Sequence, residues 1–321
     1  MGTHRSRREF LAGGVAGLGL ALMPRMASAA TFINIATGGT SGVYYPLGVA
    51  LSKIYGAALP DAKVSVQATK ASVENLNLLQ SGRAEVAFSL GDAVADAWNG
   101  EKEAGFNQKL DKLRAIGGLY NNYVQIVATE ASGIKTLADL KGKRISVGAP
   151  RSGTELNARA VLGAAGLSYN DFSKVEYLPF GESVDLMKNR QLDVTLQSAG
   201  LGVSSIKDLA TSIPIVVVPV PADVVEKIGN PAYIASEIPA NTYEGQKEEV
   251  PAVAITNILV TQSDVPDETV YTMTKAMFDH LSELTTAHSA AKGISVEKAA
   301  KNLPIPLHPG AERYYKEVNA L

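Results

Sequence analysis

Short apolar runs alternate with amphipathic stretches along most of the chain, which predicts β-strands separated by helices. Near the N-terminal end of this pattern, apolar runs at 32–36, 64–67 and 84–89 are separated by segments with helical spacing. Ser72 can cap the second of these helices and Gly82 can end it. Strands that alternate with helices in this way predict βαβ units around a largely parallel sheet.

The same order of elements restarts near residue 144. Ser41-Gly42 and Ser152-Gly153 stand 111 positions apart, each after the first strand of its region, and two further short matches follow in the same order. We therefore expect two similarly built lobes, each with a Ser-Gly loop after its first strand. The strands of the second pattern are predicted at 144–147, 175–178 and 192–196.

Two long apolar runs, at 122–129 and 253–260, are predicted to cross between the lobes and to form a two-stranded hinge. The expected fold is α/β with two lobes, each a mainly parallel sheet flanked by helices. Lobe I is predicted at 30–121 plus 225–321, and lobe II at 122–224. Amphipathic spacing near the C-terminus predicts helices that return to pack on lobe I, at 267–285 and 296–302.

The first 29 residues are predicted to be an export signal rather than part of the fold. Arg7-Arg8 precedes an apolar stretch at 11–23, and the small residues Ala27-Ser28-Ala29 offer a cleavage site near Ala29-Ala30. The pattern resembles a twin-arginine signal. The alternative, a membrane anchor, would need about 20 apolar residues. We expect a periplasmic protein.

Composition and charge exclude several classes of function for this chain of 321 residues. The formal net charge is −2, so no basic field is available for nucleic acid. There are no cysteines, which excludes disulfides, iron–sulfur clusters and thiol catalysis. His280, His288 and His308 lack the spacing of metal ligands, and no nucleophile–base pair is visible. We therefore expect no metal, no cofactor and no enzymatic activity.

Two loops rich in Gly, Ser and Thr lead from strands toward helix N-termini and are candidate anion sites. They contain Thr40 and Ser41 in one lobe and Ser152 and Thr154 in the other. A helix N-terminus offers free N–H groups and the positive end of its dipole. The alternative is that these hydroxyl groups only cap helices. The second loop lacks the lysine of a nucleotide-binding P-loop.

Five segments, in order, carry a resemblance to one known family. They read GGTSGVYYPLG at 38–48, SVENL at 72–76, LADLKGKR at 137–144, GAPRSGTELNAR at 148–159 and IPLHPGAERYY at 305–315. Together they resemble the signatures of the TAXI solute-binding proteins, the extracytoplasmic receptors of one class of TRAP transporter. The resemblance spans essentially the whole chain after the export signal.

The resemblance implies a two-lobed periplasmic-binding-protein fold, similar to type II, that closes on a small organic anion. Family members are associated with glutamate, glutamine and 2-oxo acids, and they deliver their ligand to a membrane permease driven by an ion gradient. The protein would be a monomer. By position, the resemblance assigns ligand contacts to Gly39, Thr40, Ser41, Tyr45, Ser72 and Asn75 in one lobe and to Ser152, Gly153, Thr154 and Asn157 in the other.

The chain departs from the family pattern at three places expected to face the cleft. Leu90 replaces a common Gln before Asp92, Asn121-Asn122 replaces a Pro-Glu pair after Tyr120, and Gln197-Ser198 stands in place of an aromatic-Val pair. We include Asp92, Tyr120, Gln197 and Ser198 among the candidate ligand contacts. Loss of the Glu removes a partner for a ligand amine, which favours a carboxylate such as a 2-oxo acid or dicarboxylate over an amino acid.

Three alternatives stay open beside a TRAP receptor. The same fold could serve an ABC importer, or a sensor that docks on a membrane receptor. An enzyme on a bilobal scaffold is a third alternative, because fold does not decide function.

Overall fold

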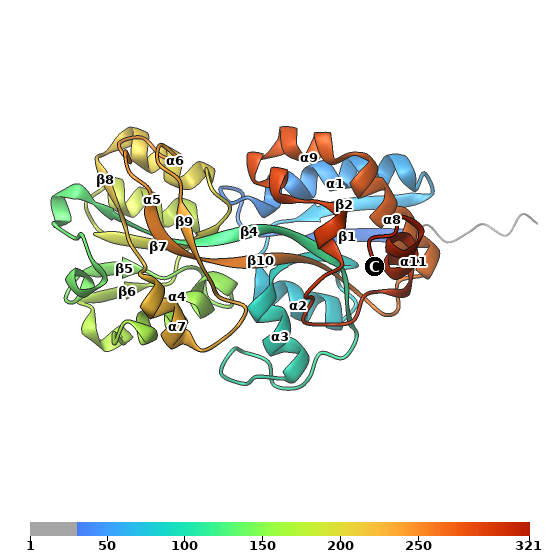
Figure 1. Ribbon diagram of the computed structural model, residues 1–321, viewed down its shortest axis with the longest axis horizontal. Coiled ribbons are helices and arrows are strands. Elements are labelled where there is room, and N and C mark those ends of the chain that lie inside the picture. The colour runs from blue at the N-terminus through green and yellow to red at the C-terminus, as the bar shows by residue number, and fades with distance from the viewer. Residues whose placement is uncertain (1–30) are drawn as a thin grey trace, which may run out of the picture. The chain divides into compact units, whose positions relative to one another are not determined.

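A ten-stranded mixed sheet runs through residues 31–321, the part of the chain that the computed structural model describes (Figure 1). The export signal predicted at 1–29 lies outside the described residues. The strand order is β2-β1-β3-β10-β4-β7-β5-β6, with β8 paired to β4 and β9 paired to β10. The strands are β1 (Thr31–Ala36), β2 (Ala62–Gln67), β3 (Val86–Leu90), β4 (Leu113–Thr129), β5 (Arg144–Ser146), β6 (Lys174–Glu176), β7 (Val194–Ala199), β8 (Ile215–Val218), β9 (Ile234–Ile238) and β10 (Val250–Gln262).

Strand pairing divides the sheet into two lobes joined by β4 and β10. In the first lobe, β1 pairs in parallel with β2 and β3; in the second, β5 pairs in parallel with β6 and β7. The end of β4 pairs with β7, whereas its earlier part pairs with β10. The beginning of β10 pairs with β9, and its later part pairs with β3. These two long strands therefore cross from one lobe to the other, as the predicted two-stranded hinge requires.

Helices cover both faces of the sheet in each lobe (Figure 1). Within the described residues, no helix is both long and apolar enough to cross a membrane. The α-helices are α1 (Tyr44–Ala58), α2 (Ser72–Gln80), α3 (Gly91–Asn99), α4 (Gly153–Ala164), α5 (Phe180–Lys188), α6 (Ser204–Ser212), α7 (Ala222–Ile228), α8 (Asp267–Asp279), α9 (Leu281–Ala287), α10 (Val296–Ala299) and α11 (Pro309–Glu317).

The core consists of two apolar layers, one on each face of the sheet. Alternate residues of the crossing strands enter opposite layers, as strand geometry requires. Val127 and Leu259 belong to one buried cluster, and their neighbours Ile126 and Val260 belong to the other. The crossing strands are therefore buried on both sides, which explains their long apolar runs.

The expected α/β fold of two lobes is confirmed, and the differences lie at element boundaries. The strand predicted at 122–129 begins earlier, at Leu113, because Gly117 and Gly118 interrupt the apolar pattern. A Cβ on Gly117 would lie 2.2 Å from the Tyr315 hydroxyl oxygen, so close packing of that ring requires glycine there. The single helix predicted at 267–285 is two helices, α8 and α9, separated at His280.

The lobe boundaries at 121/122 and 224/225 stay a prediction. Contacts around the second boundary add detail: α7 packs on α4, and β9 pairs with the beginning of β10. The chain thus lies beside elements of the second lobe until β10 returns to the first lobe, where it pairs with β3.

Candidate functional site

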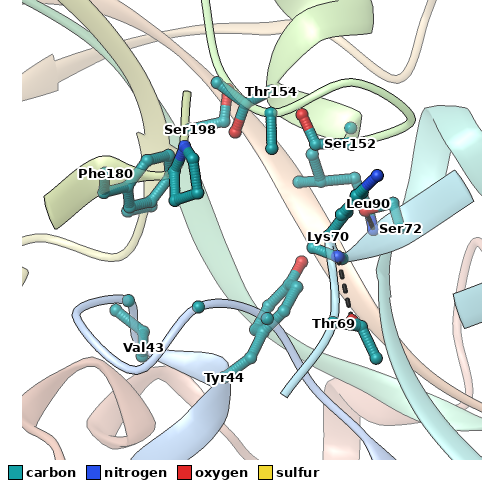
Figure 2. Close-up of a pocket in the computed structure, with 18 of the residues that line it drawn as sticks. Val43, Tyr44, Thr69, Lys70, Ser72, Leu90, Ser152, Thr154, Phe180 and Ser198 are labelled. Atoms are coloured by element: carbon teal, nitrogen blue, oxygen red, sulfur yellow. Dashed lines mark hydrogen bonds between the residues drawn. The ribbon is translucent and has the colours of Figure 1, made fainter. Parts of the chain in front are cut away.

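A cavity of about 110 Å³ lies between the lobes, where strands of both lobes end and helices begin (Figure 2). The carboxyl ends of strands in an open α/β sheet are a common place for ligands. The first lobe contributes Gly38, Gly39, Gly42, Val43, Tyr44, Thr69, Lys70, Ala71, Ser72 and Leu90, the crossing strand β4 contributes Asn122, and the second lobe contributes Ala149, Ser152, Gly153, Thr154, Pro179, Phe180, Ser198 and Ala199.

The lobes are closed around this cavity. At one rim, the Ser204 hydroxyl donates to the carbonyl oxygen of Ser41 at 2.9 Å. At another, the Glu74 N–H donates to the carbonyl oxygen of Arg151 at 3.2 Å. Gly153 meets the other lobe so closely that a Cβ there would lie 2.6 Å from both Ser72 Oγ and Leu90 Cδ1. This contact leaves no room for a larger residue.

The second-lobe loop presents the N-terminus of α4 to the cavity. Ser152 is the N-cap of this helix, and its Oγ accepts from the Glu155 N–H at 3.1 Å. Ser152 therefore caps the helix, as the alternative interpretation expected, and also lines the cavity. Gly153 and Thr154 occupy the first turn, where amide N–H groups have no preceding turn to bond to. The predicted residues Ser152, Gly153 and Thr154 are thus brought together.

The first-lobe loop does not form the predicted counterpart. Gly39 lines the cavity, but Thr40 is exposed and neither Thr40 nor Ser41 belongs to the lining. The two loops differ because α1 begins only at Tyr44, three residues after Ser41, whereas α4 begins directly after Ser152. Ligand contacts of Thr40 and Ser41 stay a prediction. Ser41 faces the rim through its carbonyl oxygen.

Tyr44, rather than the predicted Tyr45, lines the cavity. Neighbouring side chains on a helix point about 100° apart, so only one of the pair can face the cavity. The Tyr44 ring stacks on Phe88 with 5.1 Å between centroids, and its hydroxyl donates to Asn257 Oδ1. Burial raises the pKa of Tyr44, so the phenol stays neutral. The predicted Tyr120 lies elsewhere, in a separate cavity of about 560 Å³.

The candidates around α2 divide into one lining residue and one structural residue. Ser72 lines the cavity, and its Oγ accepts from the Leu90 N–H at 3.2 Å. Asn75, one turn later, lies outside the lining. Its side-chain amide donates to the carbonyl oxygens of Thr37 and Phe88, at 2.6 and 2.8 Å. Asn75 therefore positions the loops that form the cavity.

Ser198 and Gln197 lie on opposite faces of β7, because successive side chains alternate along a strand. Ser198 lines the cavity, and its buried hydroxyl has no hydrogen-bond partner among the described residues. Gln197 faces away, and its Oε1 accepts from the Ser205 hydroxyl at 2.6 Å. Gln197 therefore lies outside the cavity lining, and its predicted ligand contact stays a prediction.

Asp92 and Asn157 also lie outside the cavity lining, although both are fully buried. The Asn157 side-chain amide donates to Asp92 Oδ2 at 2.6 Å. The two predicted contacts therefore bind each other across the lobes.

The lining also contains residues that the sequence did not identify, among them Lys70, Asn122 and Phe180. Lys70 is the one charged residue that lines the cavity within residues 31–321. Asn122 donates to the Ser198 carbonyl oxygen at 3.0 Å and so joins β4 to the cavity wall. The internal repeat offered a signal for Phe180, because the 111-residue offset relates it to Thr69, which also lines the cavity.

A profile of the NMT1-like family matches residues 35–318. The chain belongs to the NMT1-like family. Solved structures with similar folds include PhnD1 from Prochlorococcus marinus (MIT 9301) in complex with methylphosphonate, at 11% identity and a TM-score of 0.58 over 91% of this chain and 100% of that one. A binding-protein component of an ABC phosphonate transporter from Pseudomonas aeruginosa matches at 14% identity and a TM-score of 0.51, over 83% and 80%. At these identities the likeness shows the periplasmic-binding-protein-like fold.

The lining of this NMT1-like protein's cavity combines hydrogen-bond donors with apolar walls. Hydroxyl groups and first-turn amides come from both lobes, and no acidic residue lines the cavity among the residues described. No group of three or more His, Asp or Glu side chains is placed to hold a metal ion within residues 31–321. The arrangement can bind a small anion and enclose it.

Proposed function

We propose that this NMT1-like protein is an exported solute-binding protein that captures a small organic anion by lobe closure. The observation that carries the proposal is the closed cavity, which is lined from both lobes by donors and by Lys70 but by no carboxylate among the described residues. Hinged closure around a ligand is a common motion of two-lobed binding proteins. Binding, rather than catalysis, is the proposed activity.

Charge and donor chemistry support an anionic ligand. The first turn of α4 points amide N–H groups toward an enclosed space, and the positive end of its dipole stabilises negative charge. The hydroxyl groups of Ser72, Thr154 and Ser198 add donors, and Lys70 adds a positive charge. An ammonium group would find no ion-pair partner in this lining, so the proposed ligand lacks an amino group.

Cavity size and apolar walls narrow the ligand further. An engineered cavity of about 150 Å³ holds benzene, so about 110 Å³ suits a ligand of roughly half a dozen non-hydrogen atoms. Val43, Leu90 and Phe180 form apolar walls beside the donors (Figure 2). We therefore propose a short monocarboxylate or 2-oxo acid with an apolar tail. Glutamate and longer dicarboxylates fit this volume less well.

The proposed partner is a membrane permease that receives the ligand from a monomeric periplasmic protein. The ABC phosphonate-transport protein among the similar structures favours an ABC importer, the alternative that we kept open. The five motifs that resemble TAXI proteins favour a TRAP permease instead. Uptake by the reconstituted permease separates the two, because an ABC importer requires ATP and a TRAP permease requires an ion gradient.

A thermal-shift and calorimetry panel on residues 30–321 tests the proposal. The probes are propionate, pyruvate, 2-oxobutyrate, methylphosphonate, glutamate, alanine and the matched amides. A ligand at about 100 times its Kd stabilises by roughly 2.7 kcal/mol, which moves the melting midpoint by several degrees. We expect shifts with the short acids and none with their amides or with alanine. Folded protein that binds none of these acids would overturn the proposal.

Lys70→Met is the variant that tests the anion preference. We expect Kd for a bound acid to rise about fivefold, because the charge at this site is partly exposed and screened by solvent. The loss should shrink as salt is added. Lys53→Met is the matched control, since Lys53 is exposed on α1 and does not line the cavity. Equal affinities of the two variants at low salt would argue against a role for Lys70.

A further inference from the structure

Three buried polar side chains join the lobes beside the cavity. Asp92 stands in the first turn of α3, Asn157 lies on α4, and Tyr233 precedes β9. Asn157 Nδ2 donates to Asp92 Oδ2 at 2.6 Å and to the Tyr233 hydroxyl oxygen at 2.9 Å. The Tyr233 hydroxyl in turn donates to the same carboxylate oxygen at 2.6 Å. The three side chains thus form a closed set of hydrogen bonds.

This cluster spans the two lobes. α3 follows β3 of the first lobe, whereas α4 packs on β7 and α7 of the second. Tyr233 belongs to the segment between α7 and β9. Strand β9 pairs with the beginning of β10. Asp92 is therefore held by two donors that arrive from elements on the other side of the cleft.

The cluster also lies beside the hinge. Gly91, the residue before Asp92, approaches the crossing strand so closely that a Cβ there would lie 3.1 Å from the Thr256 carbonyl oxygen. On the cavity side, Leu90 is two residues before Asp92, and Thr154 is almost one helical turn before Asn157. Each lobe thus connects a cavity-lining residue to a member of the cluster.

None of the three side chains lines the cavity, so a ligand would not touch them. Asp92 is 2% exposed and Asn157 is 0% exposed. Asp92 Oδ1 and Asn157 Oδ1 are buried without a hydrogen-bond partner among the described residues. A buried carboxylate with one unpartnered oxygen is costly, so the donors of the opposite lobe matter for holding it in the closed arrangement.

We propose that Asp92, Asn157 and Tyr233 form a latch beside the hinge that stabilises the closed state and thereby sets ligand affinity. Hydrogen bonds at 2.6 Å are lost when donor and acceptor separate by about 1 Å, so a small opening of the lobes breaks the latch. A ligand that requires the closed state then binds more tightly in proportion to the closed population. The three residues act as positioning residues. The effect on affinity rests on the proposed binding function.

Tyr233→Phe is the decisive variant, because it removes one hydroxyl and keeps the ring. With 2-oxobutyrate as the probe, we expect Kd to rise about tenfold, mainly through faster dissociation. Tyr169→Phe is the matched control: its hydroxyl donates to Glu155 Oε1 at 3.0 Å, entirely within the second lobe. The control should lower the melting midpoint without changing Kd. Asn157→Ala should weaken binding further. If Asn157→Ala fails to fold, the result for Tyr233→Phe alone tests the latch.

Closure is measured directly by spin labels, since the chain has no cysteine of its own. Cysteines at the exposed positions Lys53 and Glu226 place one label on α1 and one on α7. Without ligand, Tyr233→Phe should move population from the closed distance to longer distances, and Tyr169→Phe should not. Identical distance distributions and affinities in the two variants would overturn the latch. If no acid binds the wild type, the proposed function fails, and the distances measured without ligand still decide the latch.

Discussion

The two Ser-Gly loops look equivalent in the sequence and serve different purposes in the structure. Ser152-Gly153 ends at the first turn of α4, so its amides and hydroxyls face the cavity. After Ser41-Gly42 the chain continues to Tyr44 before α1 begins, and Val43 gives no side-chain cap. On this side the first residue of α1, Tyr44, presents an aromatic ring to the cavity. A shared motif predicts a shared function only where the helix begins at the same offset from it.

The largest expected difference between the two loops is in ligand affinity after the glycine of each loop is replaced by alanine. In Gly153→Ala the new Cβ would lie 2.6 Å from atoms of Ser72 and Leu90 across the cleft, so the lobes cannot close fully. We expect Kd for a bound acid to rise about 10- to 100-fold, the range that overpacking implies.

Gly42→Ala is the control, because its Cβ would meet the Gly39 carbonyl oxygen at 3.3 Å within the same loop. Calorimetry should show that Kd for the bound acid changes by less than about fivefold in Gly42→Ala. Similar losses in the two variants would contradict the difference between the loops.

Replacing the serine of each loop by alanine compares the contributions of the two loops to the free energy of unfolding. Ser152→Ala removes the N-cap of α4, which should lower the free energy of unfolding by about 1 kcal/mol. Ser41 supplies no cap, so Ser41→Ala should change stability by less than about 0.5 kcal/mol. Urea denaturation of both variants measures the difference. A larger loss for Ser41→Ala would mean that its loop is the more tightly organised one.

The smallest expected effect is a pH dependence of stability that arises at Asp92 of α3, beside Asn157 of α4. Burial raises the pKa of Asp92, the carboxylate that Asn157 of α4 holds. The folded protein thus holds this proton more tightly than the unfolded chain, whose aspartates have a pKa near 3.9. This contribution to stability is full below about pH 4 and is lost as the pH rises through the raised pKa.

Melting midpoints from pH 4 to pH 8 for the wild type and Asp92→Asn measure this dependence. The wild type should lose stability relative to the variant as the pH rises. Burial, aided by the nearby Asp92, also raises the pKa of Asp96 to about 6, so Asp96→Asn is needed to separate the two groups.

Asp193 changes stability with pH in the opposite direction. Hydrogen bonding from Arg144 lowers the pKa of Asp193, so its contribution to stability is lost as the pH falls. Parallel curves of melting midpoint against pH for the wild type and Asp92→Asn would refute the attribution of this pH dependence to Asp92.

A minority of the cavity-lining residues could be predicted from local sequence, and the lining residues that were missed depend on how the elements pack. Ser152, Gly153 and Thr154 were predicted because capping and first-turn geometry are local. Tyr44 was missed in favour of Tyr45 because the rotation of α1 depends on how its apolar side packs against the sheet. Lys70 precedes the helix that Ser72 begins, in a loop whose direction only the packed lobes determine.

Asn75 and Gln197 show the limit of transferring sites by resemblance. Both are polar, buried and close in sequence to true lining residues. Their side chains are occupied by carbonyl groups or a neighbouring serine, so they support the cavity from outside. No local pattern distinguishes a buried amide that faces a ligand from one that faces the backbone.

The sequence by itself determined the alternation of strands and helices, the repeat of two lobes and the helix start at Ser152-Gly153, because these depend on periodicity and capping within a few residues. Only the tertiary structure decided which side chains meet across the cleft. Asp92 and Asn157 are 65 positions apart, and Tyr233 is 141 positions from Asp92. Their contact depends on how β4 and β10 orient the two lobes, a geometry that the packing of the whole sheet determines.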